Sequence, residues 1–250
     1  MKAMILAAGL GTRLRPWTLS HPKALVPVGG VPMLEKVIVR LREQGFDNIV
    51  INVHHFAQQV IDYLKTRDFG VNIRVSDESG SLLDTGGGIL QASALLGEDN
   101  SPFLVHNVDI LSDAPLADLM QVHEKSGRDI SLVTSGRDSS RKLVFNQDGK
   151  LCGWKNLQTG ELRPEGFALS PEMHDSAFSG IYILNAAMLK QLGLYSSLIG
   201  SNKFPVMDFF LNSCAYNDSS VNIGEIRLDS LHLIDIGKPD TLRKAETDQW

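Results

Sequence analysis

Residues 1–28 read MKAMILAAGLGTRLRPWTLSHPKALVPV, and the predicted fold is built outward from this stretch. Its first part, Lys2 to Ala7, is an apolar run with the length of a buried strand. Gly9 and Gly11 follow at once, and glycine lets the backbone turn sharply and bring its N–H groups close to an anion. Arg13 adds a planar fork of donors that suits a phosphate. The stretch predicts a strand that ends in a phosphate-binding loop.

This loop is cationic in a chain that is acidic as a whole. The 250 residues include 24 Lys and Arg against 29 Asp and Glu, a formal net charge of −5. No acidic residue occurs before Glu35, whereas Lys23 adds a compact positive charge close to the glycines. The net charge argues against a general nucleic-acid binder, which usually presents a basic face. An anionic small-molecule substrate stays fully compatible with it.

Two glycines after a strand are also typical of an ordinary tight turn. They are not a dinucleotide fingerprint, because Leu14 stands where the third glycine is needed, and no Gly-Lys-Ser/Thr of a Walker loop follows. The longer pattern is far more specific, and it resembles the signature of the sugar-1-phosphate nucleotidyltransferases, or nucleotide-sugar pyrophosphorylases. The matching residues are Gly9, Gly11, Thr12, Arg13, Leu14, Pro16, Thr18, Pro22, Lys23, Leu25, Pro27 and Val28.

The resemblance implies an activity and its substrates. The family joins a nucleoside triphosphate to a sugar 1-phosphate, releases pyrophosphate and uses Mg²⁺. The chain most resembles the compact bacterial N-acetylmuramate-1-phosphate uridylyltransferases, so UTP is the favoured nucleotide. Mannose-1-phosphate guanylyltransferase-like proteins come next and make GTP the first alternative. A nucleotide-sugar-binding protein without turnover is the second, and a glycosyltransferase the third, although Asp109 lacks the usual Asp-x-Asp of those enzymes.

Strand and helix patterns alternate along the first half of the chain. Strands are expected at 2–7, 48–53, 71–75, 102–106 and 129–134, and helices at 32–45, 56–65, 89–96 and 115–125. This order predicts right-handed βαβ units and a Rossmann-like α/β fold, a mostly parallel or mixed sheet flanked by helices. The resemblance makes the fold GT-A-like. We expect one domain over 1–250, with a nucleotide-binding half (about 1–136) and a sugar-binding half (about 137–250).

A second glycine-rich segment, SDESGSLLDTGGGI, spans residues 76–89. Its three glycines are expected to open the helix 89–96 with N–H groups available to a ligand, and a flexible loop is the alternative. The resemblance assigns the nucleobase and part of the sugar to this segment. The expected nucleotide contacts are Leu6, Ala7, Ala8, Gly9, Gly11, Thr12, Arg13, Lys23, Glu78, Asp84, Thr85 and Gly86.

Two aspartates far apart in the sequence are the expected metal ligands. Asp109 follows the strand 102–106, and hard cations such as Mg²⁺ prefer carboxylate oxygens. An aspartate that caps a turn is the alternative. The resemblance places a metal-binding aspartate at this position and a second at Asp235, within LIDIGKPDTL. It also implies the catalytic roles: Arg13 holds the triphosphate, Lys23 bridges the two reacting phosphates, and Asp109 binds the metal.

The regular alternation ends after residue 136. Residues 142–145 and 150–154 flank Asn-Gln-Asp-Gly, which predicts a β-hairpin, and residues 137–176 are interpreted as a lid over the sugar side. The Glu-Lys-Pro sugar-phosphate motif of many relatives is absent. Lys142, Lys155 and Asn156 are candidate replacements, or else solvated surface groups. The expected sugar contacts are Gly87, Asn107, Asn156, Ser179 and Gly180.

The remaining features point to a reduced, membrane-free setting. Cys152 and Cys214 have neither metal-ligand spacing nor a pairing pattern, which favours a cytoplasmic protein. The apolar run at the amino terminus is too short to span a membrane, and no signal peptide is expected. The sequence leaves the oligomeric state open.

Overall fold

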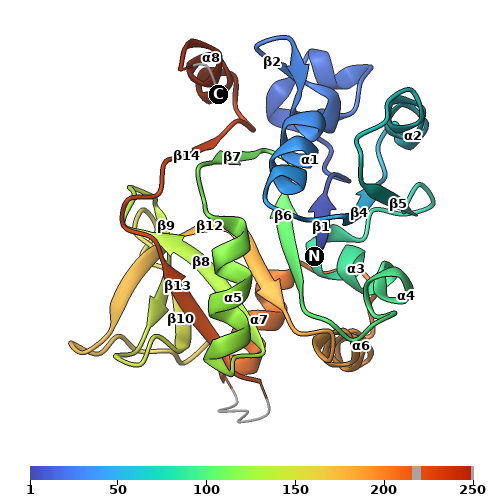
Figure 1. Ribbon diagram of the computed structural model, residues 1–250. Helices are drawn as coiled ribbons and strands as arrows, with labels where there is room; N and C mark the ends of the chain where they lie inside the picture. The colour runs from blue at the N-terminus through green and yellow to red at the C-terminus, as the bar shows by residue number, and fades with distance from the viewer. Residues whose placement is uncertain (216–220, 249–250) are drawn as a thin grey trace.

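A mixed β-sheet runs through the molecule, with helices on both of its faces (Figure 1). The computed structural model describes residues 1–215 and 221–248. Over these residues the main sheet has 10 strands, with the path β11-β10-β9-β12-β6-β1-β4-β5, and with β8 and β13 attached beside β12. The pairs β1–β4, β1–β6 and β4–β5 are parallel. The predicted α/β fold with a mixed sheet flanked by helices is confirmed.

The first half of the chain forms the parallel part of the sheet and follows the predicted order closely. Its main elements are β1 (Lys2–Leu6), α1 (Met33–Glu43), β4 (Asn48–Val53), α2 (Ala57–Lys65), β5 (Asn72–Asp77), α3 (Asp84–Gln91), α4 (Ser93–Leu96) and β6 (Phe103–Asn107). Between β1 and α1 lie three single-turn 3-10 helices, η1 (Thr12–Leu14), η2 (Trp17–Leu19) and η3 (Lys23–Leu25), and the small pair β2 (Pro27–Val28) and β3 (Val31–Pro32).

The second half adds antiparallel strands, among them those of residues 137–176, the segment interpreted from the sequence as a lid. Its elements are β7 (Ile110–Ser112), α5 (Leu116–Ser126), β8 (Ile130–Ser135), β9 (Arg141–Phe145), β10 (Leu151–Asn156), β11 (Leu162–Arg163), β12 (His174–Leu184), α6 (Met188–Ile199), α7 (Val206–Ala215), β13 (Ile223–Arg227), β14 (Leu233–Asp235) and α8 (Pro239–Thr247). The predicted hairpin is present, since β9 and β10 pair antiparallel. Figure 1 shows these strands extending from the sheet at the side away from β5.

Strand β1 illustrates why the apolar run folds at the centre of the sheet. All five of its residues are buried. Ala3 and Ile5 join the core formed with α1, α2 and α5, while Met4 and Leu6 join the core formed with α3, α6 and α7. Successive side chains of a strand point to opposite faces, so a continuous apolar run serves both cores.

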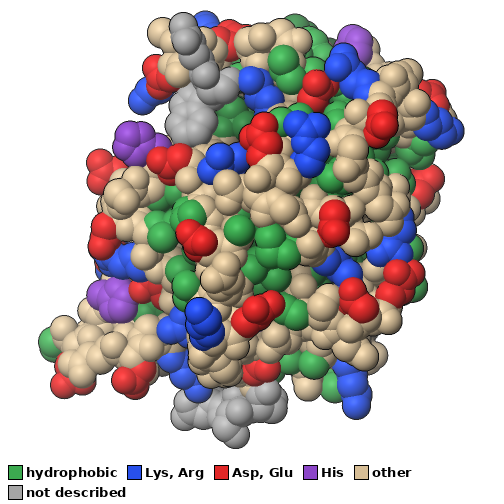
Figure 2. All heavy atoms as spheres, viewed as in Figure 1, with side chains coloured by type: hydrophobic (Ala, Val, Ile, Leu, Met, Phe, Trp, Pro, Cys, Tyr) green, Lys and Arg blue, Asp and Glu red, His purple; other side chains and the backbone are tan. Residues whose placement is uncertain are grey.

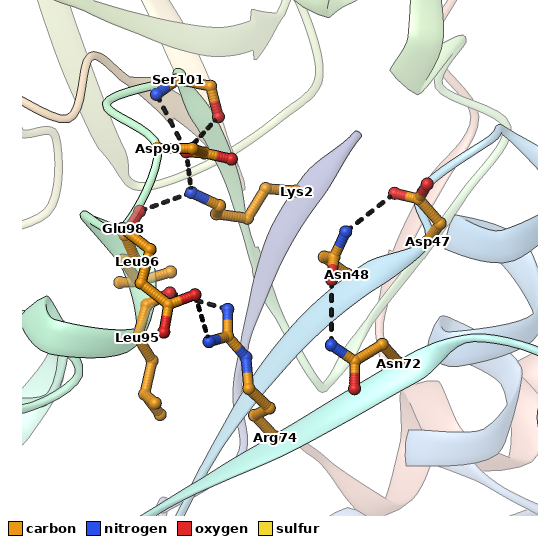
Figure 3. Close-up of polar contacts among 10 residues, drawn as sticks. All are labelled: Lys2, Asp47, Asn48, Asn72, Arg74, Leu95, Leu96, Glu98, Asp99 and Ser101. Atoms are coloured by element: carbon orange, nitrogen blue, oxygen red, sulfur yellow. Dashed lines mark hydrogen bonds and ion pairs between the residues drawn. The ribbon is translucent and has the colours of Figure 1, made fainter.

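Polar contacts hold the sheet at the end opposite the glycine loop (Figure 3). Lys2, the first residue of β1, is 5% exposed and pairs with Asp99, and its Nζ donates to the carbonyl of Leu96 at 2.7 Å. On β5, Arg74 pairs with Glu98 at 2.6 Å. A buried ammonium is costly without such partners, so these contacts fix the turn after α4 against the amino ends of the strands.

The structure corrects several expected boundaries. Helix α3 begins at Asp84 rather than at Ile89, so the three glycines lie inside the helix rather than before it. The apolar run at residues 178–184 predicts a further strand, and the observed strand β12 begins four residues earlier, at His174. Strands β7, β13 and β14 and helix α6 were not expected. The first and last of these strands pair only through contacts distant in sequence, which local periodicity does not reveal.

Two surface properties bear on the partners of the molecule. Over the residues that the structure describes, no helix is both long enough and apolar enough to cross a membrane. On the face shown in Figure 2, basic and acidic side chains are interspersed rather than gathered by sign.

Candidate active site

A cavity of about 400 Å³ opens where β1, β4 and β6 end. Parallel α/β sheets bind ligands beyond the carboxyl ends of their strands, so this position agrees with the predicted site. The walls come from the glycine loop, the end of β4, the start of α3, the β6–β7 turn and the segment after β14. The lining residues are Leu6, Ala8, Gly9, Leu10, Gly11, Thr12, Arg13, Lys23, Asn52, Leu82, Asp84, Thr85, Asn107, Val108, Asp109 and Gly237.

Gly11 shapes the loop at the cavity rim. Its φ of 63° lies in the left-handed region that favours glycine. A Cβ there would lie 2.8 Å from the Cβ of Lys23 and 2.9 Å from the Cγ2 of Thr18. The hydroxyl of Thr18 donates to the carbonyl of Gly11 at 2.8 Å. The loop therefore packs directly against Lys23, the lysine that is expected to bind phosphate.

Lys23 and Asp109 meet inside this cavity. The Nζ of Lys23 forms an ion pair with the Oδ2 of Asp109, and the two side chains are only 12% and 14% exposed. Removing two charges from water is costly unless both keep partners. A bound phosphate would replace the carboxylate as the partner of Lys23, and a cation would replace the ammonium as the partner of Asp109. The pair is thus arranged to exchange partners when ligands enter.

Asp235 and Arg13 also lie close to Asp109, around Gly237. Strand β14 pairs with β7 so that Asp235 lies opposite Ile110, the residue after Asp109. A Cβ at Gly237 would lie 2.8 Å from the Oδ2 of Asp109, 2.9 Å from the Oδ1 of Asp235 and 3.0 Å from an Nη of Arg13. The structure therefore brings together the two predicted metal ligands and both predicted phosphate-binding cations.

The pair of carboxylates suits Mg²⁺ as the residues stand. The Oδ2 of Asp109 and the Oδ1 of Asp235 both lie within 3 Å of one point, the position that a Cβ would take at Gly237. Mg²⁺ is usually held by one or two carboxylates, with waters and substrate phosphates completing the coordination. Within residues 1–215 and 221–248, no cluster of three or more His, Cys, Asp or Glu is arranged to hold a metal. Waters and substrate oxygens would therefore complete the coordination at this site.

A buried polar network supports the glycine loop from behind. The Oδ1 of Asn52 accepts the backbone N–H of Ala7 at 2.8 Å, and its Nδ2 donates to the Oε1 of Glu78 at 2.8 Å. Asn52 and Glu78 are 2% and 3% exposed. Burial raises the pKa of Glu78, and its Oε2 has no hydrogen-bond partner within the described structure. Glu78, expected at the nucleotide, therefore lies beneath the loop and lines an adjacent cavity.

Sequence reasoning missed Asn52, although a signal was available. It is a polar residue in the otherwise apolar, β-branched run of β4, where a buried amide requires partners. Ala7 was expected to touch the nucleotide, and its backbone N–H is used by this asparagine instead.

The family follows from a match along almost the whole chain. The model of the nucleotidyl transferase family matches residues 2–249. The chain belongs to this family. A mannose-1-phosphate guanylyltransferase 1 of Arabidopsis thaliana is 31% identical over 209 residues, which are 82% of this chain and 55% of that protein. A mannose-1-phosphate guanyltransferase of Aspergillus fumigatus is 33% identical over 210 residues, 83% of this chain and 56% of that protein. The chain thus spans about half the length of these relatives.

A solved structure shows that the fold is shared as well. The crystal structure of a putative glucose-1-phosphate thymidylyltransferase from Bacillus anthracis superimposes with a TM-score of 0.77. It has 19% sequence identity and covers 99% of this chain and 94% of its own. The resemblance to sugar-1-phosphate nucleotidyltransferases, predicted from the first 28 residues, is confirmed.

In this nucleotidyl transferase the second glycine-rich segment is only partly at the cavity. Asp84 and Thr85 line it, as expected. Asp84 has a φ of 64°, a conformation that aspartate tolerates better than most residues. The hydroxyl of Thr85 accepts the N–H of Val206 at 2.9 Å, which ties the start of α3 to α7.

The expectation that the glycine N–H groups are free for a ligand is wrong. The N–H groups of Gly86 and Gly87 donate to the carbonyl of Phe204 at 2.9 and 3.2 Å. A Cβ at Gly86 would lie 2.4 Å from the Phe204 ring, and one at Gly87 would lie 2.0 Å from the carbonyl of Asn202. These glycines let the segment before α7 pack against α3, and the sequence alone does not show which segment needs the space.

Of the expected sugar contacts, Asn107 lies at the cavity. Gly180 has a φ of 77° and packs against it, since a Cβ at Gly180 would lie 2.9 Å from the Nδ2 of Asn107. Ser179 is turned away: it is fully buried and its hydroxyl donates to the carbonyl of Val133 at 2.7 Å. It stabilises the bulge where β12 shifts register against β8. The structure does not bring Ser179 to the cavity.

The three candidate replacements for the Glu-Lys-Pro motif already have partners in the lid. The Nζ of Lys142 donates to the carbonyl of Arg137 at 2.8 Å, and Lys155 pairs with Asp175 at 2.6 Å. The side chain of Asn156 accepts the N–H of Gln158 at 2.9 Å and closes the turn after β10. None of the three lines the cavity at the glycine loop.

Proposed function

We propose that this chain transfers a nucleotidyl group from a nucleoside triphosphate to a sugar 1-phosphate, releasing pyrophosphate. The observation that carries the proposal is the convergence of Arg13, Lys23, Asp109 and Asp235 at Gly237, at the rim of the cavity closed by the glycine loop. Membership of the nucleotidyl transferase family supports it independently.

The chemistry follows from the charges that meet there. A phosphate oxygen of the sugar 1-phosphate attacks the α-phosphorus of the nucleotide, and the bond to pyrophosphate breaks. The attacking phosphate is already ionised near neutral pH, so no general base is needed, and positioning with charge neutralisation supplies the rate. Lys23 lies between the two phosphates, which repel one another, and Arg13 stabilises the charge on the leaving pyrophosphate.

Asp109 and Asp235 would hold Mg²⁺. The metal, when bound, supplies positive charge at the reacting phosphates and helps to orient them. The residues of the chain prepare this site for the metal, because the ion pair with Lys23 holds the Asp109 side chain in place until a cation competes for it. We assign nucleotide binding to about residues 1–136 and sugar binding to about residues 137–250.

Two substrate pairs are candidates, each on its own observation. GTP with mannose 1-phosphate is supported by the names of the relatives that are 31% and 33% identical. UTP with N-acetylmuramate 1-phosphate is supported by Leu83-Asp84-Thr85 and the three glycines that follow, which resemble the Glu-Thr-Gly-Gly-Gly segment of the muramate enzymes. The comparisons favour the first pair.

The test is pyrophosphate release across a grid of triphosphates and sugar 1-phosphates with Mg²⁺. The grid includes GTP with mannose 1-phosphate and UTP with N-acetylmuramate 1-phosphate, and Lys23→Met protein serves as the inactive control. Activity with one pair above all others establishes the reaction and both substrates. A grid without turnover, in a protein that still binds nucleotide tightly, would overturn the proposal in favour of a nucleotide-sugar-binding protein.

A further inference from the structure

A second cavity, of about 800 Å³, lies on the other side of Asp235. Asp235 lines this cavity, whereas Gly237, two residues further on, lines the cavity at the glycine loop. Of the two predicted metal carboxylates, Asp109 lines the cavity at the glycine loop and Asp235 lines the second cavity. Arg137, Lys238 and Lys244 line the second cavity together with the acidic Asp138 and Asp248. Because oxygens of both aspartates lie close to Gly237, a nucleotide in the first cavity and a second anion in the other would each lie beside one member of the pair.

Arg137 is the unexplained residue of this cavity. It follows the end of β8, and one Nη donates to the carbonyl of Phe178 at 2.8 Å. Its Nε is buried and has no hydrogen-bond partner within the described structure. A buried donor without a partner is destabilising, and a guanidinium stays charged in proteins. Burial lowers the pKa of Arg137, whereas the nearby charge of Asp235 raises it.

The contact with Phe178 also connects Arg137 to the sugar side. Phe178 directly precedes the bulge of β12, in which Gly180 packs against Asn107. Arg137 and Asn107 therefore contact neighbouring residues of the same bulge. A substrate held between Asn107 and Asp235 would lie beside the guanidinium.

We propose that Arg137 binds the phosphate of the sugar 1-phosphate. This assignment rests on the proposed function and deepens it, because it names a cation for the sugar phosphate in place of the three candidates expected from the sequence. A guanidinium presents a planar fork that matches phosphate, and a phosphate oxygen would give the orphaned Nε its missing partner. Lys142, Lys155 and Asn156, the residues expected in this role, are already bonded within the lid.

The test compares Arg137→Met and Arg137→Lys with a surface arginine, Arg243→Met. Arg243 is 75% exposed and pairs with Asp240 across one turn of α8. Steady-state kinetics use the substrate pair that is active in the grid. Each variant is assayed with mannose 1-phosphate and with N-acetylmuramate 1-phosphate as the sugar phosphate. We expect Arg137→Met to lower kcat/KM for the sugar phosphate about 10- to 100-fold, with the KM for the triphosphate within about 2-fold of wild type. Arg137→Lys should recover part of the loss, and Arg243→Met should match wild type.

Equilibrium binding separates this proposal from the proposed function. Calorimetric titration with mannose 1-phosphate, and with mannose as the uncharged control, needs no turnover, and the melting temperature with triphosphate binding reports folding. The assignment is supported if folded Arg137→Met protein loses binding of mannose 1-phosphate while its binding of mannose is unchanged. This result supports it even if the wild type proves inactive. Equal losses for both substrates, or unchanged sugar-phosphate binding, would overturn it. A loss confined to N-acetylmuramate 1-phosphate would also overturn it, because Arg137 would then bind the sugar carboxylate.

Discussion

The loop at the end of β1 and the lid of β9–β11 use their polar side chains in opposite ways. At the loop, Lys23 and Asp109 are bonded to one another in a cavity where a ligand can replace either partner. In the lid, Lys155 is bonded to Asp175, and Asn156 closes a turn. A polar residue at the carboxyl end of a parallel strand therefore predicts function here, whereas a polar residue in an antiparallel hairpin mainly stabilises the hairpin.

The largest effect should separate these two lysines directly. Lys23→Met removes the cation that lies between the reacting phosphates, and we expect kcat to fall by about 10²- to 10³-fold, as for loss of an oxyanion donor. Lys155→Met is the matched lid variant, since it also removes one lysine from an ion pair. Steady-state pyrophosphate release should change only a few-fold there. Comparable kcat values for the two variants would contradict the difference between loop and lid.

The pH dependence of the free energy of unfolding tests whether the half that carries the glycine loop makes the protein sensitive to acid. Burial lowers the pKa of His106, on β6, from its ordinary value of 6.5 to about 4. The unfolded chain therefore binds a proton before the folded chain does, so the free energy of unfolding falls as pH drops from about 6.5 to about 4. The shift corresponds to at most about 3 kcal/mol.

Denaturant unfolding at pH 7 and pH 5 measures this loss. His106→Gln should remove most of the difference between the two pH values, while His232→Gln, at an exposed histidine, should keep it. The raised pKa of Glu78 acts with the opposite sign, because its burial favours the protonated form as pH falls. An unchanged pH dependence in His106→Gln protein would assign acid sensitivity to other groups.

Gly237→Ala adds one carbon atom at the point where Asp109, Asp235 and Arg13 meet, and so tests whether activity needs them close together. Its Cβ would crowd both aspartates and Arg13, at 2.8 to 3.0 Å. We expect kcat to fall about 10- to 100-fold with little change in melting temperature, because the displaced groups are charged side chains rather than core. Gly193→Ala is the control, since its Cβ would meet only Leu90, at an ordinary 3.8 Å. Wild-type kcat in Gly237→Ala protein would mean that the carboxylates are not held together in the active state.

The parallel half was predictable because its signals are local. Apolar runs such as Lys2–Leu6, helical periodicity and strand-end positions all lie within one element and give its type directly. The same logic placed Asp109 at a strand end, beside the loop. The family resemblance then supplied Asp235, which no spacing or periodicity could connect to Asp109.

The remaining parts depend on contacts distant in sequence. Gly86 and Gly87 are needed because the segment before α7 packs on them, and Gly237 is needed because the pairing of β14 with β7 brings two carboxylates together. Arg137 was not among the site residues expected from the sequence, and it becomes a candidate only because it lines one cavity together with the residues of β14. These requirements come from tertiary packing. The sequence therefore gives the residue at each position but does not show why that residue is needed.

The smallest expected effect tests the lid itself, through Asn156→Ala. Asn156 was expected to touch the sugar, whereas its side chain accepts the N–H of Gln158 at 2.9 Å. Loss of one exposed turn hydrogen bond should cost about 1 kcal/mol of stability or less and change kcat/KM for the sugar phosphate by under about 3-fold. Melting temperature and steady-state kinetics measure both. A 10-fold rise in the KM for the sugar phosphate would restore Asn156 as a sugar ligand, and the lid would then close on the substrate in a conformation other than the present one.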